Sequence, residues 1–108
     1  MGRYITTTGT ASPVTRTIST TYTAEASDRL LCVTTAGAFT VTLPASPLEG
    51  DQVQIIDVVS NFNTANLTIA RNGSLINGSA ANLTADVDGA IVTLLYTGGT
   101  YGWVITST

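Results

Sequence analysis

Apolar residues and threonine alternate strictly in the run Phe39-Thr40-Val41-Thr42-Leu43. This period of two is typical of a β-strand that has one buried and one exposed face. Pro44 and Pro47 follow at once and prevent the strand from continuing, because proline lacks a backbone N–H. Threonine, which is β-branched, makes up about a fifth of the chain and favours strands over helices. These features indicate an all-β protein.

Further segments have the same strand character and are separated by turn residues. They are residues 29–35, 52–58, 67–71, 89–97 and 101–106. Ala36-Gly37 predicts a tight turn, and therefore a hairpin between residues 29–35 and the strand that begins at Phe39. Gly98-Gly99-Thr100 predicts the loop of a second hairpin near the C-terminus.

Two Asn-Gly pairs, Asn72-Gly73 and Asn77-Gly78, are strong turn signals, because both residues accept positive φ angles. Residues 74–76 between them would then be a very short strand. No segment has an apolar face at helical spacing over three turns. The sequence therefore predicts a small antiparallel β-sandwich or barrel.

The alternation also predicts the core. In residues 29–35 we expect Leu31 and Val33 to face inward. Cys32 is the only cysteine, so an intrachain disulfide is impossible, and its apolar neighbours indicate a small core residue rather than a reactive thiol. The expected core comprises Leu31, Val33, Phe39, Val41, Leu43, Val53, Ile55, Leu67, Ile69, Ile76, Leu83, Val92, Leu94 and Trp103.

Residues 1–15 differ from the rest and are expected to form an extended N-terminal arm, followed by a single β domain in residues 16–108. The arm contains too few large apolar side chains to build a core. We expect it to pair with a neighbour's sheet edge through its backbone. The partner-binding residues would be Arg3, Tyr4, Ile5 and Val14. The alternative is that the arm folds back onto its own domain as an extra edge strand.

Charged residues make up only 10% of the chain, against about 25% in an ordinary soluble domain. There is no lysine to protect exposed strand edges, which predicts a homo-oligomer, and a trimer in particular. The net charge of -3 and four scattered arginines argue against nucleic acid as a partner. No apolar run approaches the ~20 residues that a membrane-spanning helix needs.

The chain contains no histidine, so a Ser-His-Asp or Cys-His arrangement cannot be built. We expect no enzymatic activity, no cofactor and no metal. Asp86 and Asp88 resemble part of a calcium loop but lack its terminal glutamate, so turn formation is the favoured role and a bound cation the alternative. Tyr101 and Trp103, with Tyr96, would form either a sugar-binding face or part of the core. Four Asn-X-Ser/Thr sequences, beginning at Asn66, Asn72, Asn77 and Asn82, are interpreted as chance matches to a glycosylation signal.

Two segments, residues 38–44 and 49–53, resemble a β-rich module of tail-fibre, appendage and head-decoration proteins of tailed bacteriophages, particularly marine phages and cyanophages. The resemblance continues through residues 66–78, Leu94-Leu95-Tyr96 and Gly102-Trp103, and covers about two-thirds of the chain. It implies a β-rich virion component, usually trimeric, with no catalytic residues.

This resemblance implies a structural protein of the virion that is assembled in the bacterial host cytoplasm. Its partners would be the major capsid protein or a tail protein. We favour a capsid decoration (cement) protein, because the chain ends shortly after Trp103 without a shaft or tip domain. The alternatives are a tail or fibre component, such as an adaptor or short fibre, and a carbohydrate-binding module.

Overall fold

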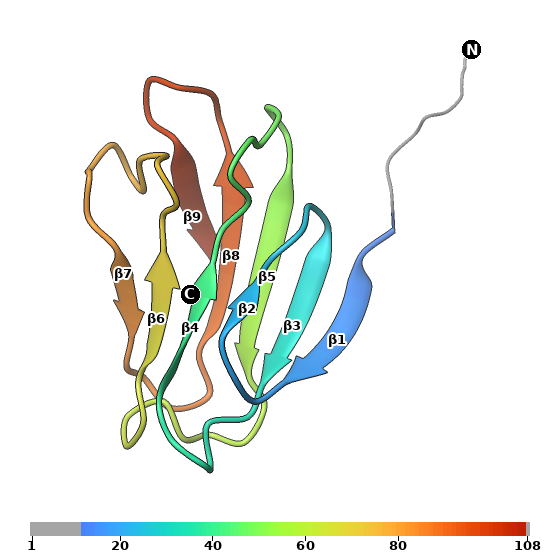
Figure 1. Cartoon of the computed structure of the whole chain (residues 1–108), viewed down its shortest axis with the longest axis vertical. Coiled ribbons are helices and arrows are strands. Elements are labelled where there is room, and N and C mark those ends of the chain that lie inside the picture. The colour runs from blue at the N-terminus through green and yellow to red at the C-terminus, as the bar shows by residue number, and fades with distance from the viewer. Residues whose placement is uncertain (1–11, 108) are drawn as a thin grey trace.

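The computed structural model describes residues 12–107 of the chain, and this part is all-β, without a helix. A five-stranded sheet has the order β1-β3-β5-β8-β9, and a four-stranded sheet has the order β2-β4-β6-β7 (Figure 1). The strands are β1 (Val14–Ile18), β2 (Tyr22–Thr23), β3 (Asp28–Cys32), β4 (Phe39–Thr42), β5 (Gln52–Asp57), β6 (Leu67–Ala70), β7 (Leu83–Ala85), β8 (Ile91–Tyr96) and β9 (Trp103–Ser107).

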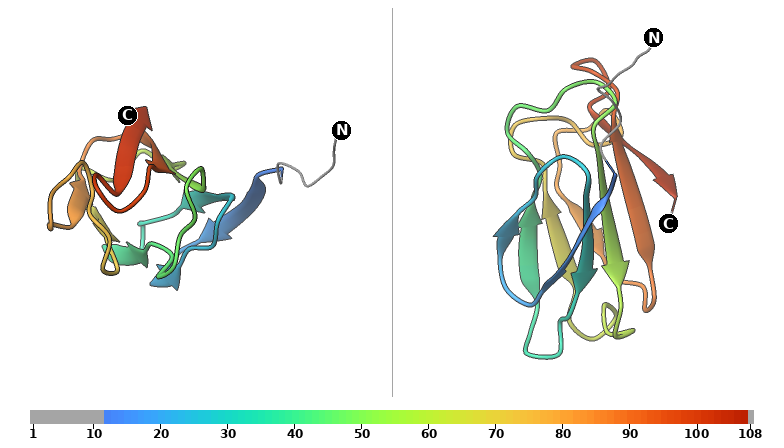
Figure 2. Two further views of the ribbon diagram at one scale, coloured as in Figure 1. Left: turned by 90° about the horizontal axis from the view of Figure 1, so that it is seen from above. Right: turned by 90° about the vertical axis from the view of Figure 1, so that its right-hand side faces the viewer.

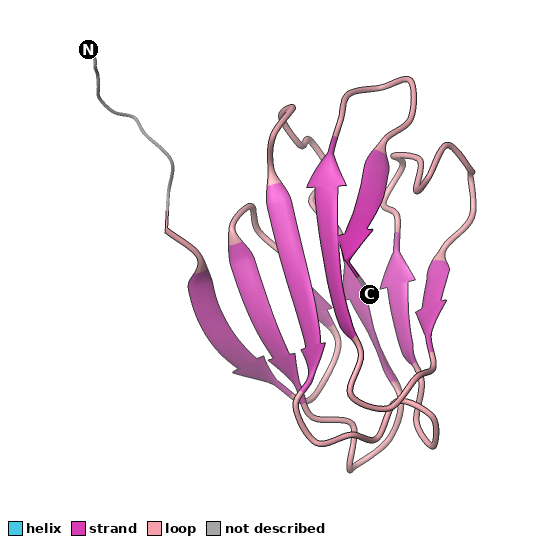
Figure 3. Cartoon of the chain, turned by 180° about the vertical axis from the view of Figure 1, so that it is seen from behind, coloured by secondary structure: helices cyan, strands magenta, loops and turns pink. Residues whose placement is uncertain are grey.

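Up to β6, the chain alternates between the two sheets, which form two layers when seen from above (Figure 2). Successive strands of each sheet therefore run in the same direction, and β1-β3-β5 and β2-β4-β6 are parallel. β7, β8 and β9 are added in antiparallel pairs. Figure 3 shows the resulting five-stranded sheet from behind. The prediction of an antiparallel fold is wrong, because both sheets are mixed.

The predicted hairpin around Ala36-Gly37 is also wrong. β3 and β4 belong to different sheets, so residues 33–38 connect the two layers instead of closing a hairpin. The C-terminal hairpin is confirmed, since β8 pairs with β9 in antiparallel fashion. A turn sequence predicts that the chain reverses direction, but it does not predict in which sheet the next strand lies.

Both Asn-Gly pairs have the predicted turn geometry. Asn72 and Gly73 have φ angles of 51° and 90°, and Asn77 and Gly78 have φ angles of 51° and 76°. Residues 74–76 are not a strand, however. Ile76 makes only isolated bridges, and the antiparallel partner of β6 is β7.

The core lies between the sheets, and most of its members are those expected. In β3 the prediction is wrong: Leu30 and Cys32 are buried, whereas Leu31 and Val33 are half-buried on the other face. Leu83 is only half-buried and packs against the core. Buried but unpredicted are Ala24, Leu30, Phe62 and Ala85, and the buried predicted residues are Phe39, Val41, Leu43, Val53, Ile55, Leu67, Ile69, Ile76, Val92, Leu94 and Trp103.

The start of β9 is fixed by a close contact with residues 75–77. The backbone N–H of Trp103 donates to the carbonyl of Leu75 at 2.8 Å, and that of Asn77 donates to the carbonyl of Trp103 at 2.7 Å. Gly102 has a φ of 75°, and a Cβ at this position would lie 2.1 Å from the carbonyl oxygen of Leu75. Only glycine therefore fits between these two segments.

Candidate interaction surfaces

Arg3, Tyr4 and Ile5, predicted to bind a partner, lie outside the described residues. Val14 is the first residue of β1, the free edge of the five-stranded sheet, and it is 45% exposed. β1 pairs with β3, and the Val14 N–H donates to the carbonyl of Ser27 at 2.8 Å. Val14 and Thr15, the last two residues of the predicted arm, thus belong to β1.

The outer face of the five-stranded sheet carries an apolar strip, formed by Leu31, Ile56 and Ile91. These three residues are in register across β3, β5 and β8. Ile91 is 43% exposed, and the other two are half-buried. Val58, which directly follows β5, is 49% exposed. The face of β3 that carries Leu31, which the sequence predicts to be buried, therefore lies on the outer surface of the sheet. Soluble proteins normally keep such a surface polar.

A polar row crosses the same face beside the apolar strip. Arg29, Gln54 and Thr93 are in register on β3, β5 and β8. The Arg29 Nε donates to Gln54 Oε1 at 3.0 Å, and Gln54 Nε2 donates to Thr93 Oγ1 at 3.1 Å. The charged group on this face is thus engaged within the sheet.

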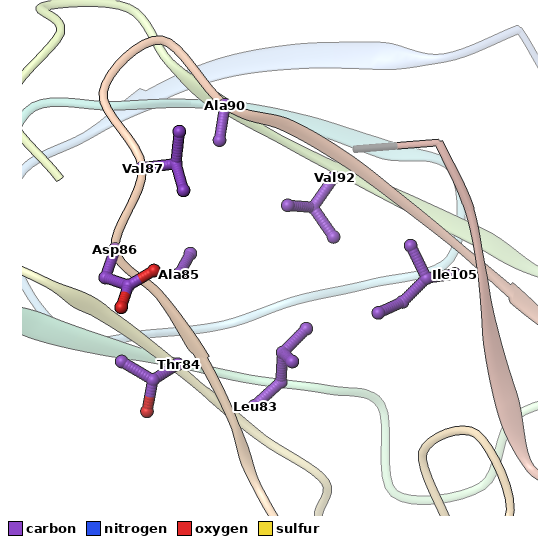
Figure 4. Close-up of a pocket in the computed structure, with 8 residues that line it drawn as sticks. All are labelled: Leu83, Thr84, Ala85, Asp86, Val87, Ala90, Val92 and Ile105. Carbon is purple, nitrogen blue, oxygen red and sulfur yellow. The ribbon is translucent and has the colours of Figure 1, made fainter. Parts of the chain in front are cut away.

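A groove of about 210 Å³ lies where β7 and β9, the free edges of the two sheets, come together (Figure 4). Thr84 and Asp86 are its polar lining residues. Its apolar lining consists of Leu83, Ala85, Val87, Ala90, Val92 and Ile105. Because the lining comes from β7, β8, β9 and the loop between β7 and β8, no single segment of the sequence indicates the groove.

The loop from Asp86 to Gly89 is organised by hydrogen bonds. Asp88 Oδ1 accepts a hydrogen bond from the Asn63 N–H at 2.8 Å, and the Gly89 N–H donates to Asp57 Oδ2 at 3.0 Å. Asp86 and Asp88 are exposed. Within residues 12–107, no three His, Cys, Asp or Glu side chains gather in a way that could hold a metal ion. The contacts of Asp88 are those of a residue that stabilises a loop.

Tyr96, Tyr101 and Trp103 do not form a common sugar-binding face. Trp103 is completely buried, which confirms its predicted place in the core. The half-buried ring of Tyr96 packs edge-on against it, with the ring centroids 5.3 Å apart. Tyr101 alone of the three is strongly exposed. A stacking platform needs aromatic faces exposed together, and the structure separates them.

The asparagine side chains of the four Asn-X-Ser/Thr sequences all make hydrogen bonds to the backbone of this chain. Three of the partners lie in other turns or strands and one lies in the same loop, so each amide helps to position a loop. The pairs are Asn66 with Phe62, Asn72 with Leu43, Asn77 with Ile105, and Asn82 with Arg71.

The buried carboxylate of Asp57 joins two loops at one end of the molecule. It is 4% exposed, and its Oδ2 accepts hydrogen bonds from the N–H groups of Asn61, Phe62 and Gly89 at 2.8, 2.9 and 3.0 Å. These groups belong to the loops that follow β5 and β7, which lie at the lower end of Figure 1. The three hydrogen bonds compensate the burial of Oδ2, whereas Oδ1 is buried without a hydrogen-bond partner among the described residues.

A second buried carboxylate, Asp28, closes the side of the molecule where β1 and β2 lie. Its Oδ1 accepts from Arg16 Nε at 3.0 Å, and its Oδ2 accepts from the Tyr22 hydroxyl at 3.0 Å and from the Glu25 N–H at 2.8 Å. The hydrogen bond to Asp28 raises the pKa of Arg16. Burial, followed by the hydrogen bond to Asp28, raises the pKa of Tyr22. Asp28 therefore connects strands of both sheets.

The single cysteine lies in the core and is shielded from solvent. Burial raises the pKa of the Cys32 thiol to about 12. The thiolate is the reactive form of cysteine, so this thiol is chemically inert near neutral pH. The structural role predicted for Cys32 is confirmed by its burial.

Comparison with protein-family models and with curated proteins finds no match to this chain. Residues 12–107 include no helix long and apolar enough to cross a membrane. The candidate functional features are therefore those that the structure of this chain itself shows. They are the free edges of the two sheets, the apolar strip and the groove between β7 and β9.

Proposed function

We propose that the protein is a non-enzymatic structural component of a tailed-bacteriophage virion, and that it decorates and stabilises the capsid as a homo-oligomer. The observation that carries this proposal is the apolar strip of Leu31, Ile56 and Ile91 on the outer face of the five-stranded sheet. Contiguous apolar residues on a surface mark an interaction site. In a decoration protein, such a strip would be covered by other copies of the protein or by the major capsid protein.

The use of the arginines supports association through these surfaces. Arg16 is bonded to Asp28, Arg29 to Gln54, and Arg71 Nη1 to the carbonyl of Ser74 at 3.0 Å. The cationic side chains within residues 12–107 are thus held by intramolecular hydrogen bonds. Free strand edges are normally protected by cationic residues, lysine above all, and this chain has no lysine.

The two buried acids support a structural role rather than catalysis. Asp28 binds side chains and backbone of three neighbouring segments, and Asp57 binds the backbone of two loops. A catalytic carboxylate must instead face a space where a substrate can reach it. Both oxygens of Asp28 and Oδ2 of Asp57 are thus engaged in holding the fold together, and both side chains are buried.

We also infer that the two sheets form an open sandwich, preceded by an extended N-terminal arm. Each sheet ends in free strands, β1 and β9 in one and β2 and β7 in the other. Among the described residues, no two named strands pair across the sheets. An open sandwich leaves strand edges for association, as at β1, β2 and β7, whereas a closed barrel leaves none. The outer edge of β9 is already bonded to residues 75–77 at Trp103.

The residues that resemble phage virion modules occupy positions that build this fold. Residues 38–44 include β4, residues 66–78 include β6 and both Asn-Gly turns, and Gly102-Trp103 opens β9. Their order and spacing correspond to strands and turns of this fold. The resemblance is the basis for placing the protein in a virion that is assembled in the bacterial host cytoplasm.

The number of copies per particle tests the proposal. We expect quantitative mass spectrometry of purified particles, from the phage whose genome encodes the chain, to find hundreds of copies. A few or a few dozen copies would instead indicate a tail or fibre component. Absence from the particles, or specific binding on a glycan array by the Tyr101 surface, would contradict the proposed function.

A further inference from the structure

We propose that β1 pairs with β1 of a second copy of this chain, in antiparallel fashion, with Thr17 opposite Thr17 of the second copy on a two-fold axis. The inference rests on the self-association that is part of the proposed function, and it assigns one contact of that association to a defined edge and register. This contact continues the five-stranded sheet of one copy into that of the next.

β1 is the longest strand with a free edge in residues 12–107. It has five residues, whereas β2 and β7, which also lie at sheet edges, have two and three. The outer edge of β9 is already bonded to residues 75–77 at Trp103. Figure 1 shows β1 at the outside of its sheet, with no strand beyond it. Within the described chain, β1 therefore offers the most backbone to an added strand.

The edge of β1 lacks the features that normally prevent strands from pairing between molecules. β1 contains neither proline nor lysine, and its pairing with β3 has no bulge. Its one charged residue is Arg16. The Arg16 Nε donates to the buried Asp28 at 3.0 Å, and its Nη2 lies 3.9 Å from Glu25 Oε1. The charge is thus engaged within its own domain, and the edge remains open to pairing.

The backbone groups at this edge belong to Thr15 and Thr17. Alternate residues of a strand direct their N–H and C=O groups toward opposite neighbours. The Val14 N–H and the Ile18 carbonyl are bonded, at 2.8 and 2.9 Å, to the residues that flank β3. Even-numbered residues of β1 therefore face β3, and Thr15 and Thr17 direct their N–H and C=O groups away from it.

Two copies that share this edge are related by a two-fold axis, so their strands run antiparallel. Three registers place the edge-facing threonines of β1 in hydrogen-bonded pairs. Thr15 on Thr15 places Pro13 opposite Thr17, and proline has no N–H to donate. Thr15 on Thr17 places Arg16 directly opposite Arg16 of the second copy, and like charges in this position are destabilising. Thr17 on Thr17 avoids both conflicts.

The outer face of the sheet selects the same register. Thr17 is in register with Leu31, and therefore with the apolar strip that Leu31 forms with Ile56 and Ile91. With Thr17 on Thr17, the apolar strips of the two copies meet in line. With Thr15 on Thr17, each strip would instead run into the polar row of the other copy, which begins beside Thr15. Matching cross-strand pairs, including Thr on Thr, stabilise a sheet.

This contact joins oligomers to one another. A ring of three has no two-fold axis within it, so β1 of one trimer pairs with β1 of a neighbouring trimer. The pairing involves about five residues from each copy, whereas a stable interface has about 20–30 residues a side. The contact is therefore weak by itself and forms where the local concentration is high, as on the surface of a capsid.

A covalent trap in the full-length protein tests the register. In a hydrogen-bonded antiparallel pair, facing Cα atoms lie about 5.5 Å apart, which a disulfide can span. We expect Thr17→Cys to form disulfide-linked pairs of chains on oxidation at least about tenfold faster than Thr15→Cys. Two cysteines at position 15 would lie four residues apart along the paired strands, or about 13 Å. The natural chain should form none, because Cys32 is buried.

Equal rates for the two cysteine variants would overturn the inference, since both side chains are exposed and random collisions link them equally. Faster linking of Thr15→Cys would overturn the assigned register.

A charge at the two-fold axis tests the contact without a covalent bond. In sedimentation velocity at high protein concentration, we expect the natural oligomer to form a species of twice its mass. Thr17→Lys should raise the dissociation constant of this doubling about three- to tenfold, because it places two ammonium groups opposite each other. Thr100→Lys, the same change at an exposed position in the loop between β8 and β9, is the control and should have no effect. A natural oligomer that never doubles, or a Thr17→Lys oligomer that doubles as readily, would overturn the inference.

Failure of this inference can be distinguished from failure of the proposed function. Oligomers that do not link through β1 would overturn the inference and leave the virion role, which the number of copies per particle tests, standing. Absence of the protein from purified particles would contradict the virion role. It would leave the pairing of β1, which is measured with the isolated protein, unaffected.

Discussion

Trp103 is the largest of the completely buried side chains, although it directly follows an exposed loop. Three contacts hold it in place. Gly102 allows the backbone to approach Leu75, the Trp103 N–H donates to the carbonyl of Leu75, and the ring of Tyr96 packs against the indole. One aromatic residue thus links the C-terminal hairpin to the loop between β6 and β7.

We expect Trp103→Ala to lower the free energy of unfolding by about 3–5 kcal/mol, because it empties a large aromatic site in the core. Trp103→Phe should cost much less. It leaves a smaller cavity, and it removes a buried indole N–H that has no hydrogen-bond partner among the described residues. Denaturant unfolding of both variants measures the difference. A loss below about 1 kcal/mol for Trp103→Ala would contradict the buried position.

Stability should fall at alkaline pH. Burial raises the pKa of Cys32 from 9.0 to about 12, and the pKa of Tyr22 is also raised above 10.0. Because both groups bind their protons more tightly when folded, their contribution is complete below pH 9 and is lost as the pH rises toward 12. Urea midpoints measured from pH 7 to pH 11 test this. Cys32→Ala should reduce the slope above pH 9, and an unchanged slope would show that the thiol does not contribute.

At the scale of elements, the sequence predicts most strands but not their partners. The alternation in residues 39–43 and the Asn-Gly turns are local features, and the structure confirms both. Residues 30–33 are all apolar, so a period of two cannot decide whether Leu30 or Leu31 faces the core. The pairing of β3 with β1 and β5, rather than with β4, depends on contacts between distant segments.

The candidate site is less predictable still. Val14 can be identified from sequence as an apolar residue of the N-terminal segment, but only the structure shows that it belongs to an edge strand. Asp86 can be identified from the sequence as an acidic residue. Its place on the rim of an apolar groove, however, depends on the approach of β7 to β9 in the folded chain. Sequence patterns within one segment contain no information about such an approach.

The two loops joined by Asp57 should loosen together when its carboxylate is removed. Asp57→Ala leaves the N–H groups of Asn61, Phe62 and Gly89 without their acceptor, and that of Phe62 is buried, so we expect a loss of about 3 kcal/mol in the free energy of unfolding. Asp57→Asn retains one acceptor oxygen and should lose less. Hydrogen exchange should accelerate at Asn61, Phe62 and Gly89 in the alanine variant. Faster exchange at only one of the two loops would contradict the shared anchor.

For the molecule as a whole, the two sides of the fold are unequal. On the side of β1 and β2, Asp28 links both sheets through Arg16 and Tyr22. On the opposite side, β7 and β9 leave an apolar groove, and the apolar strip lies on the face between the two sides. Association through the groove and the apolar strip would therefore cover one side and one face of the molecule.

We expect the purified protein to be a homotrimer in the absence of other virion proteins. Static light scattering at micromolar concentration measures its mass directly. Because the surfaces involved are mainly apolar, the mass should change little when salt is raised to 1 M, where charge interactions are screened within about 3 Å. A stable monomer would count heavily against the trimer, and dissociation by salt would indicate an interface made mainly of charges.

The alternation of the chain between layers also affects how quickly the protein can fold. β5 lies between β3 and β8 in its sheet, so its two sides are completed by segments far apart along the chain. Among the described strands, β8 and β9 form a hairpin with a short loop, and β6 pairs with β7 across a longer one. Topologies dominated by such distant pairings have a high contact order and fold in milliseconds to seconds. During synthesis on the ribosome, β5 remains unpaired on one side until β8 has emerged, which ends at residue 96. Until then, the apolar strand β5 is open to pairing with other nascent chains.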